Sequence, residues 1–179
     1  MMAKGPERDY VQWCVLVGLT VLAALLQGSL LHWWSFLGVK LDLVLVLVTS
    51  FTLLRGRRDG VILAAVGGVL LDFLSGRYLG LHVLGKTTVA CLIGLVRDVV
   101  YKENYLVPFS TTFLGTLVDQ GIYVGAARLS GLRIGSGILG HVLVSAALAN
   151  SLLTLCVYFR LAALERFLRR RDEEERRLS

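Results

Sequence analysis

The chain has 179 residues, 55% of them hydrophobic and 18% charged, with a mean hydropathy of +0.68. A water-soluble domain of this composition would lack polar surface, so we expect most of the chain to face lipid. The formal charge of +6 does not indicate DNA or RNA binding. Most basic residues flank apolar runs or lie in the C-terminal tail, where membrane orientation explains them.

Six apolar runs follow one another along the chain. A helix needs about 20 apolar residues to cross a hydrocarbon core of about 30 Å. The runs cover residues 11–31, 39–54, 61–75, 81–100, 106–127 and 135–159. They predict an all-α, polytopic membrane protein, in which a bundle of six transmembrane helices forms a single domain over residues 1–159.

The second and third runs are short, and each carries an aspartate near one end. A re-entrant segment, or one helical hairpin partly buried in protein, is therefore an alternative to two full crossings. Six crossings are favoured over five or four.

The positions of lysine and arginine orient the predicted bundle, because cytoplasmic segments of membrane proteins hold the excess of basic residues. With six crossings and a cytoplasmic start, 14 of the 19 basic residues fall on the inside. Those on the outside are Lys40, Arg77, Arg128 and Arg133. Both termini are therefore expected in the cytoplasm.

Ionisable side chains within the predicted spans are functional candidates, because burial in lipid is costly for them. They are Asp42, Asp72, Lys86, Asp119 and His141, all in the outer half of the membrane. We expect an intramembrane polar cluster in which Asp72 and Lys86 pair across the turn at residues 75–80, and Asp42 and Asp119 line the same core. For Asp42 and Asp72, the alternative is that each snorkels or caps a helix end.

Glycines within the spans are interpreted as packing positions, because small residues let helix backbones approach closely in lipid. They are Gly67 and Gly68 in the third run, Gly76 and Gly80 around the following turn, and Gly121 and Gly125, which form a GxxxG pattern in the fifth run. Packing within the chain is favoured, and a partner interface is the alternative.

The tail at residues 160–179 is expected to continue the last span as a charged amphipathic helix. Its basic side chains, which include Arg166, Arg169, Arg170 and Arg171, favour a stop-transfer segment at the anionic inner leaflet, so membrane lipid is an expected partner. Docking to a cytoplasmic protein is the alternative.

Enzyme chemistry and bound cofactors are not expected. The sequence has no GxSxG, no HExxH and no P-loop lysine. His82 and His141 have no second ligand three or four residues away, so no metal site is expected. Cys14, Cys91 and Cys156 lie singly in apolar runs and are interpreted as packing residues.

The stretch at residues 60–85, GVILAAVGGVLLDFLSGRYLGLHVLG, resembles the rod shape-determining protein MreD family. The resemblance rests on the pattern D-x-L-S-G-x-x-L-G that begins at Asp72, and Asp119 is similar to a later acidic position of that family. Chain length and the number of predicted spans also fit.

The resemblance implies a non-enzymatic scaffold of the bacterial cell-elongation machinery in the cytoplasmic (inner) membrane, which supports cell shape and lateral peptidoglycan synthesis. It implies direct binding to the bitopic protein MreC, and indirect association with MreB, RodZ and RodA with its transpeptidase. The family is also similar in helical architecture to the substrate-binding subunits of energy-coupling-factor transporters, a fold-level analogy that carries no activity. A small-molecule-binding transport subunit is the alternative function.

Overall fold

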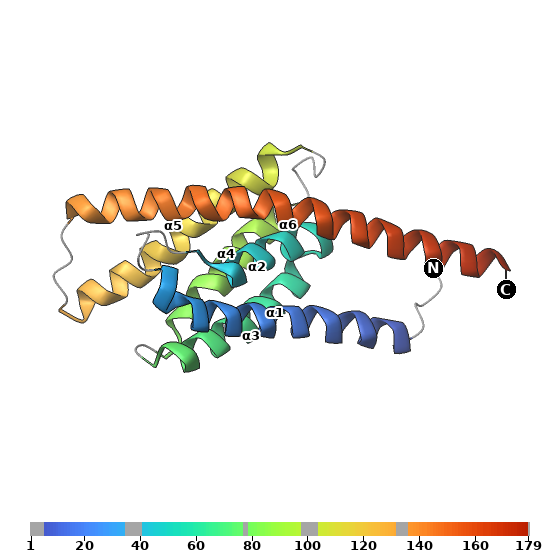
Figure 1. The fold of residues 1–179 in the computed structure, drawn as a ribbon, viewed down its shortest axis with the longest axis horizontal. Helices are drawn as coiled ribbons and strands as arrows, with labels where there is room; N and C mark the ends of the chain where they lie inside the picture. Colours follow the sequence, from blue (N-terminus) through green and yellow to red (C-terminus); the bar gives the residue numbers. More distant parts are fainter. Residues whose placement is uncertain (1–5, 35–40, 77–78, 98–103, 132–135, 179) are drawn as a thin grey trace.

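The computed structural model describes residues 6–34, 41–76, 79–97, 104–131 and 136–178, with side chains for 13–29, 41–76, 79–97, 104–131 and 140–163. These ranges contain six helices and no strand, which confirms the all-α prediction (Figure 1). The helices are α1 (Pro6–Trp34), α2 (Leu43–Arg55), α3 (Arg57–Ser75), α4 (Leu81–Val96), α5 (Leu106–Leu129) and α6 (Ser136–Leu178).

Helix α2 lies at the centre of the bundle. It contacts each of the other five helices, and every residue from Val44 to Leu53 is buried. With 13 residues it is about 20 Å long, shorter than a hydrocarbon core of about 30 Å. A short helix is tolerated at membrane depth when protein surrounds it, because its terminal polar groups then need not face lipid.

Helices α2 and α3 form a hairpin with Gly56 between them. Gly56 has φ of +120°, which favours glycine. A Cβ atom there would lie 2.7 Å from the Arg97 guanidinium. Arg97 donates hydrogen bonds to the carbonyls of Leu53 and Leu54, at 2.9 and 3.0 Å. Arg97 therefore closes the C-terminal end of α2, whose last carbonyls have no partner within the helix.

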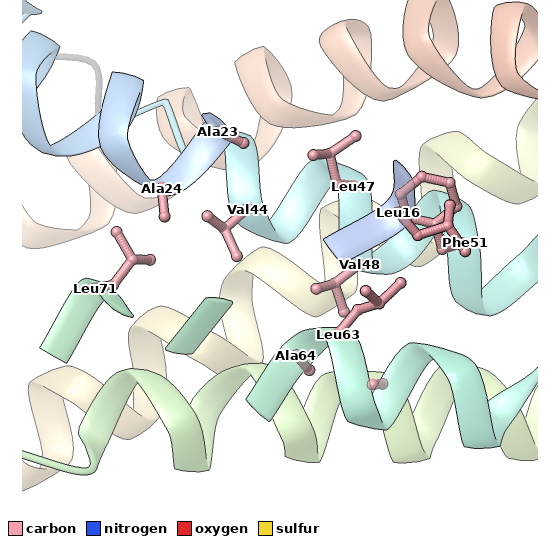
Figure 2. Close-up of a cluster of buried hydrophobic side chains, with 11 residues drawn as sticks. Leu16, Ala23, Ala24, Val44, Leu47, Val48, Phe51, Leu63, Ala64 and Leu71 are labelled. Carbon is pink, nitrogen blue, oxygen red and sulfur yellow. The ribbon is translucent and has the colours of Figure 1, made fainter. Parts of the chain in front are cut away.

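The apolar core is built around α2, and Figure 2 shows its largest cluster, to which α1, α2, α3 and α4 contribute. Close backbone approach makes this packing possible. A Cβ on Gly67 would meet the Val44 side chain, and one on Gly68 would lie 2.6 Å from the Val83 Cα. Both glycines therefore lie where helices of the chain pack closely against each other.

The outer faces of the surrounding helices are apolar, whereas the interior holds polar side chains. Exposed leucines, valines and isoleucines occur on α1, α3, α4, α5 and α6. Buried polar side chains include those of Thr20, Gln27, Asp42, Thr49, Ser50, Thr52, Asp72, Lys86, Thr112, Thr116, Asp119, Asn150, Ser151 and Thr154. An apolar outer surface together with polar side chains in the interior fits a bundle surrounded by lipid.

Within the described residues, Gly140–Ala163 of α6 is the segment long and apolar enough by itself to cross a membrane. Apolar helices at Trp13–Ser29, Leu43–Arg55 and Leu81–Val96 are shorter. Helix α6 runs on to Leu178 and is about 64 Å long. Helix α1 begins and α6 ends at the same end of the bundle (Figure 1).

Candidate functional site: a buried polar cluster

Lys86 is the centre of a buried ion-pair cluster. Its ammonium lies 2.6 Å from Oδ2 of Asp42 and 3.5 Å from Oδ2 of Asp119. The Lys86 side chain is wholly buried, and 7% and 8% of the two aspartate side chains are exposed. The cluster therefore joins α2, α4 and α5 through side chains that are almost wholly buried.

Asp42 holds its place because it is also the N-cap of α2. Its Oδ1 accepts a hydrogen bond from the Leu45 amide at 2.8 Å. The first amides of a helix have no partner within it, and a carboxylate there also interacts favourably with the helix dipole. One side chain thus caps the central helix and binds Lys86.

Neutral polar side chains from α1 and α6 accept hydrogen bonds from backbone amides at the start of α2. The Asp42 amide donates to Oδ1 of Asn150 at 2.9 Å, and the Val44 amide donates to Oε1 of Gln27 at 3.2 Å. Side chains from two other helices thus satisfy amides that α2 itself leaves unpaired. This arrangement explains why a helix end with orphan amides is stable inside the bundle.

Hydrogen bonds extend from this point along the interface between α2, α5 and α6. The Asn150 amide nitrogen donates to Oγ1 of Thr116 at 3.4 Å. Further along, Thr112 donates to Oγ1 of Thr49 at 3.2 Å. Buried polar groups that pair with one another specify a single packing arrangement, because any slip leaves them unsatisfied.

One glycine of α4 and one of α5 allow the two helices to approach closely at the cluster. A Cβ on Gly85 would meet Oδ1 of Asp119, and one on Gly115 would lie 2.8 Å from Cγ1 of Val89. Helices α4 and α5 therefore approach closely at the position where Lys86 reaches Asp119. Neither glycine is among the packing positions predicted from the sequence.

Asp72 does not pair with Lys86, so the expected ion pair across the turn is wrong. Its carboxylate instead accepts hydrogen bonds from the amides of Gly80, His82 and Val83, at 2.9, 3.0 and 3.3 Å. Asp72 lies at the end of α3 and caps the start of α4, which is the capping alternative drawn from the sequence. Three amides that lack partners in α4 satisfy the carboxylate, and Lys86 remains free to bind the other two aspartates.

The glycines of the turn serve backbone conformation rather than packing. Gly76 and Gly80 have φ values of +60° and +95°, and a Cβ on either would have no neighbour within 4 Å. The left-handed region is accessible to glycine at no steric cost. The prediction that Gly76 and Gly80 are helix-packing positions is therefore wrong.

Three other predicted residues lie apart from the cluster. His141 is exposed on α6 and does not join the aspartates and Lys86. Gly121 and Gly125 are exposed on α5, with no atom within 4 Å of an added Cβ, so they do not pack within the chain. The side chains of Arg166, Arg169, Arg170 and Arg171 lie outside the described residues.

Ionisable groups within the spans do not indicate the neutral members of the network or the cap of α2. These are Gln27, Asn150, Thr112, Thr116 and Arg97. An amide side chain within an apolar run also needs a partner inside the membrane. Gln27 and Asn150 could therefore have been predicted from the sequence as members of a buried polar network.

Comparison with protein families supports a specific assignment. The family model of the rod shape-determining protein MreD matches residues 7–166, and that family consists of membrane proteins. Neither a curated protein nor a solved structure matches the chain, so the likeness to energy-coupling-factor subunits stays a prediction. Because the match covers most of the 179 residues, the chain belongs to the MreD family of rod shape-determining proteins.

Proposed function

We propose that this protein is a non-enzymatic scaffold of the bacterial cell-elongation machinery, a multi-pass component of the inner membrane that binds MreC directly. Through MreC it would associate with MreB, RodZ and RodA with its transpeptidase, and so support lateral peptidoglycan synthesis. Family membership supports the role in rod shape. The rest of the proposal is drawn from the resemblance and from the architecture.

The observation that carries the proposal is the internal pairing of the buried polar groups. No buried side-chain nitrogen or oxygen of the described residues lacks a hydrogen-bond partner. The polar cluster is thus engaged in holding α1, α2, α4, α5 and α6 together, which suits a rigid scaffold. The transport alternative would require a cavity lined by a few convergent polar groups that orient the ligand.

The apolar outer surface supports a topology of six crossings with both termini in the cytoplasm. Lipid would cover the exposed leucines and valines, and the other helices enclose the short α2. The start of α1 and the end of α6 lie at one end of the bundle, as an even number of crossings requires. Reporter fusions to the two termini test this, and opposite locations would contradict it.

The proposed contact with the transmembrane helix of MreC is the exposed side of α5 at Gly121 and Gly125. Helix association in lipid depends on close packing and interhelical hydrogen bonds, since lipid is as apolar as leucine. Both glycines leave space for a second backbone, because no atom lies within 4 Å of an added Cβ.

Co-purification from detergent tests this contact. We expect the double variant Gly121→Leu, Gly125→Leu to keep its thermal unfolding midpoint, to lose most of the bound MreC, and to fail to restore rod shape in cells depleted of their own MreD. Gly140→Leu is the matched control, since this exposed helical glycine also has no neighbour within 4 Å. MreC binding that is equal in the double variant, the control and the unchanged protein would contradict the proposed surface.

The transport alternative is tested with the same purified protein. A ligand that binds only the native state raises its stability by RT ln(1 + [L]/Kd). Thermal stabilisation by a vitamin-like small molecule, absent in the Lys86→Met variant, would replace the scaffold proposal with a transport function.

A further inference from the structure

The ion-pair cluster is unequal in charge. Asp42 and Asp119 supply two carboxyl groups, and Lys86 supplies one ammonium. In the described part of the chain, every salt bridge of the two aspartates goes to Lys86. With both carboxyls ionised, the buried site would hold an excess negative charge, and an uncompensated buried charge tends to neutralise by taking up a proton.

The two carboxyl groups differ in how well their charge is stabilised. Asp42 has the shorter contact with Lys86, accepts the Leu45 amide, and lies at the positive end of the α2 dipole. For Asp119, the 3.5 Å contact with Lys86 is the one hydrogen bond that its carboxyl makes within the described residues. Asp119 also lies in the middle of α5, where the flanking amides are already paired within the helix.

The other helices bring little further charge to the site. Helices α1 and α6 contribute the neutral amides of Gln27 and Asn150. From α3 comes Asp72, whose carboxylate binds three amides of the next helix and its entry turn. His82 of α4, one turn before Lys86, stacks its ring on Tyr123 of α5 at a centroid distance of 5.7 Å. Among these neighbours of the cluster, His82 is the side chain besides Lys86 that can carry a positive charge.

We propose that the cluster is a proton-binding site, in which the carboxyl of Asp119 takes up one proton from water and holds it in the folded protein. The cluster of Asp42, Lys86 and the neutral Asp119 then has no net charge. This inference goes beyond the scaffold role and does not depend on which partner the protein binds.

Infrared spectroscopy of the full chain at neutral pH, in a detergent without ester or carboxyl groups, tests the proposal, because a protonated carboxyl has a C=O stretching band well separated from the carboxylate bands. We expect this band in the unchanged protein and its loss in Asp119→Asn. Asp59→Asn is the matched control, since Asp59 is a partly buried aspartate in the first turn of α3, and it should keep the band.

Stability provides a second and independent measurement. Asparagine has the shape of a neutral aspartic acid, so Asp119→Asn should shift the thermal midpoint by no more than about 2–4 °C. Asp42→Asn removes an ionised partner of Lys86 and should lower the midpoint by more than Asp119→Asn does.

Three outcomes would overturn the proposal. The first is a band that persists unchanged in Asp119→Asn, and the second is an Asp119→Asn variant that fails to fold. The third is the absence of the band from the unchanged protein. If the band then appears in His82→Gln, the charge is balanced by His82 rather than by a proton on Asp119.

Discussion

Two aspartates near helix ends, Asp42 and Asp72, illustrate two ways of keeping a carboxylate inside this bundle. Asp72 is satisfied by the backbone, through three amides at the start of the next helix. Asp42 needs a lysine from another helix as well as an amide of its own helix. The first arrangement is local in sequence, whereas the second depends on the whole bundle being assembled.

The difference has a consequence for stability. Loss of the Asp72 cap affects the connection between α3 and α4, which are neighbours in the chain. Loss of the ion pairs around Lys86 affects three helices at once, because α2, α4 and α5 meet there. Removal of Lys86 should therefore destabilise the protein more than removal of Asp72.

The largest effect is expected for Lys86→Met. Removal of one partner of a buried ion pair costs about 3–5 kcal/mol, because the remaining charge is left without compensation. Thermal unfolding in detergent should show a large drop in the midpoint, and the double variant Lys86→Met, Asp42→Asn should recover part of it. A double variant less stable than Lys86→Met would show that charge compensation is not the reason for the pairing.

A smaller effect is expected for Asp72→Ala, at about 1–3 kcal/mol, because three amides lose a charged acceptor but can find water or lipid headgroups at the helix end. Asp72→Asn keeps one acceptor oxygen and should lose less. Asp59→Ala serves as the control, as a partly buried aspartate in the first turn of α3. Equal stability of the two Asp72 variants and the control in the same assay would contradict the capping role.

The contrast between Asp42 and Asp72 also shows what the sequence can predict. Six helices could be located because hydrophobic runs are long and local, and each helix of the structure overlaps one of the runs. The ends of a helix differ from the ends of its apolar run where charged residues belong to the helix. Helix α3, for example, begins at Arg57, before the apolar run itself starts.

Partner choice within the site could not be predicted in the same way. Asp72 and Lys86 are close in sequence, so a pair between them was the natural hypothesis, yet Lys86 binds an aspartate 44 residues before it and another 33 residues after it. Their common depth in the membrane predicts a single cluster of Asp42, Asp72, Lys86, Asp119 and His141. The structure pairs Lys86 with Asp42 and Asp119 and leaves Asp72 and His141 outside these ion pairs. Depth does not tell which side of its helix a residue occupies, and this information appears only once the helices pack.

The substitution Asn150→Ala tests the neutral hydrogen bonds beside the ion-pair cluster. It removes the acceptor of the Asp42 amide and the donor to Thr116, and should cost about 1–2 kcal/mol, since interhelical hydrogen bonds in membranes contribute modestly. Asn150→Asp would place a third carboxyl beside Asp42 and should cost more. If the aspartate variant is the more stable of the two in thermal unfolding, like-charge repulsion does not govern this site.

The smallest effect is expected within the turn itself, for Gly80→Ala. The methyl group meets no atom within 4 Å, so any loss arises from the φ of +95°, which an L side chain adopts at a cost of about 1 kcal/mol. Gly121→Ala is the matched comparison, with equal free space but helical backbone, and should be neutral or slightly stabilising because alanine favours helix. If both substitutions change the unfolding midpoint equally, the turn does not depend on the left-handed conformation. The Asp72 carboxylate would then reach the Gly80 amide from a backbone that any residue can adopt.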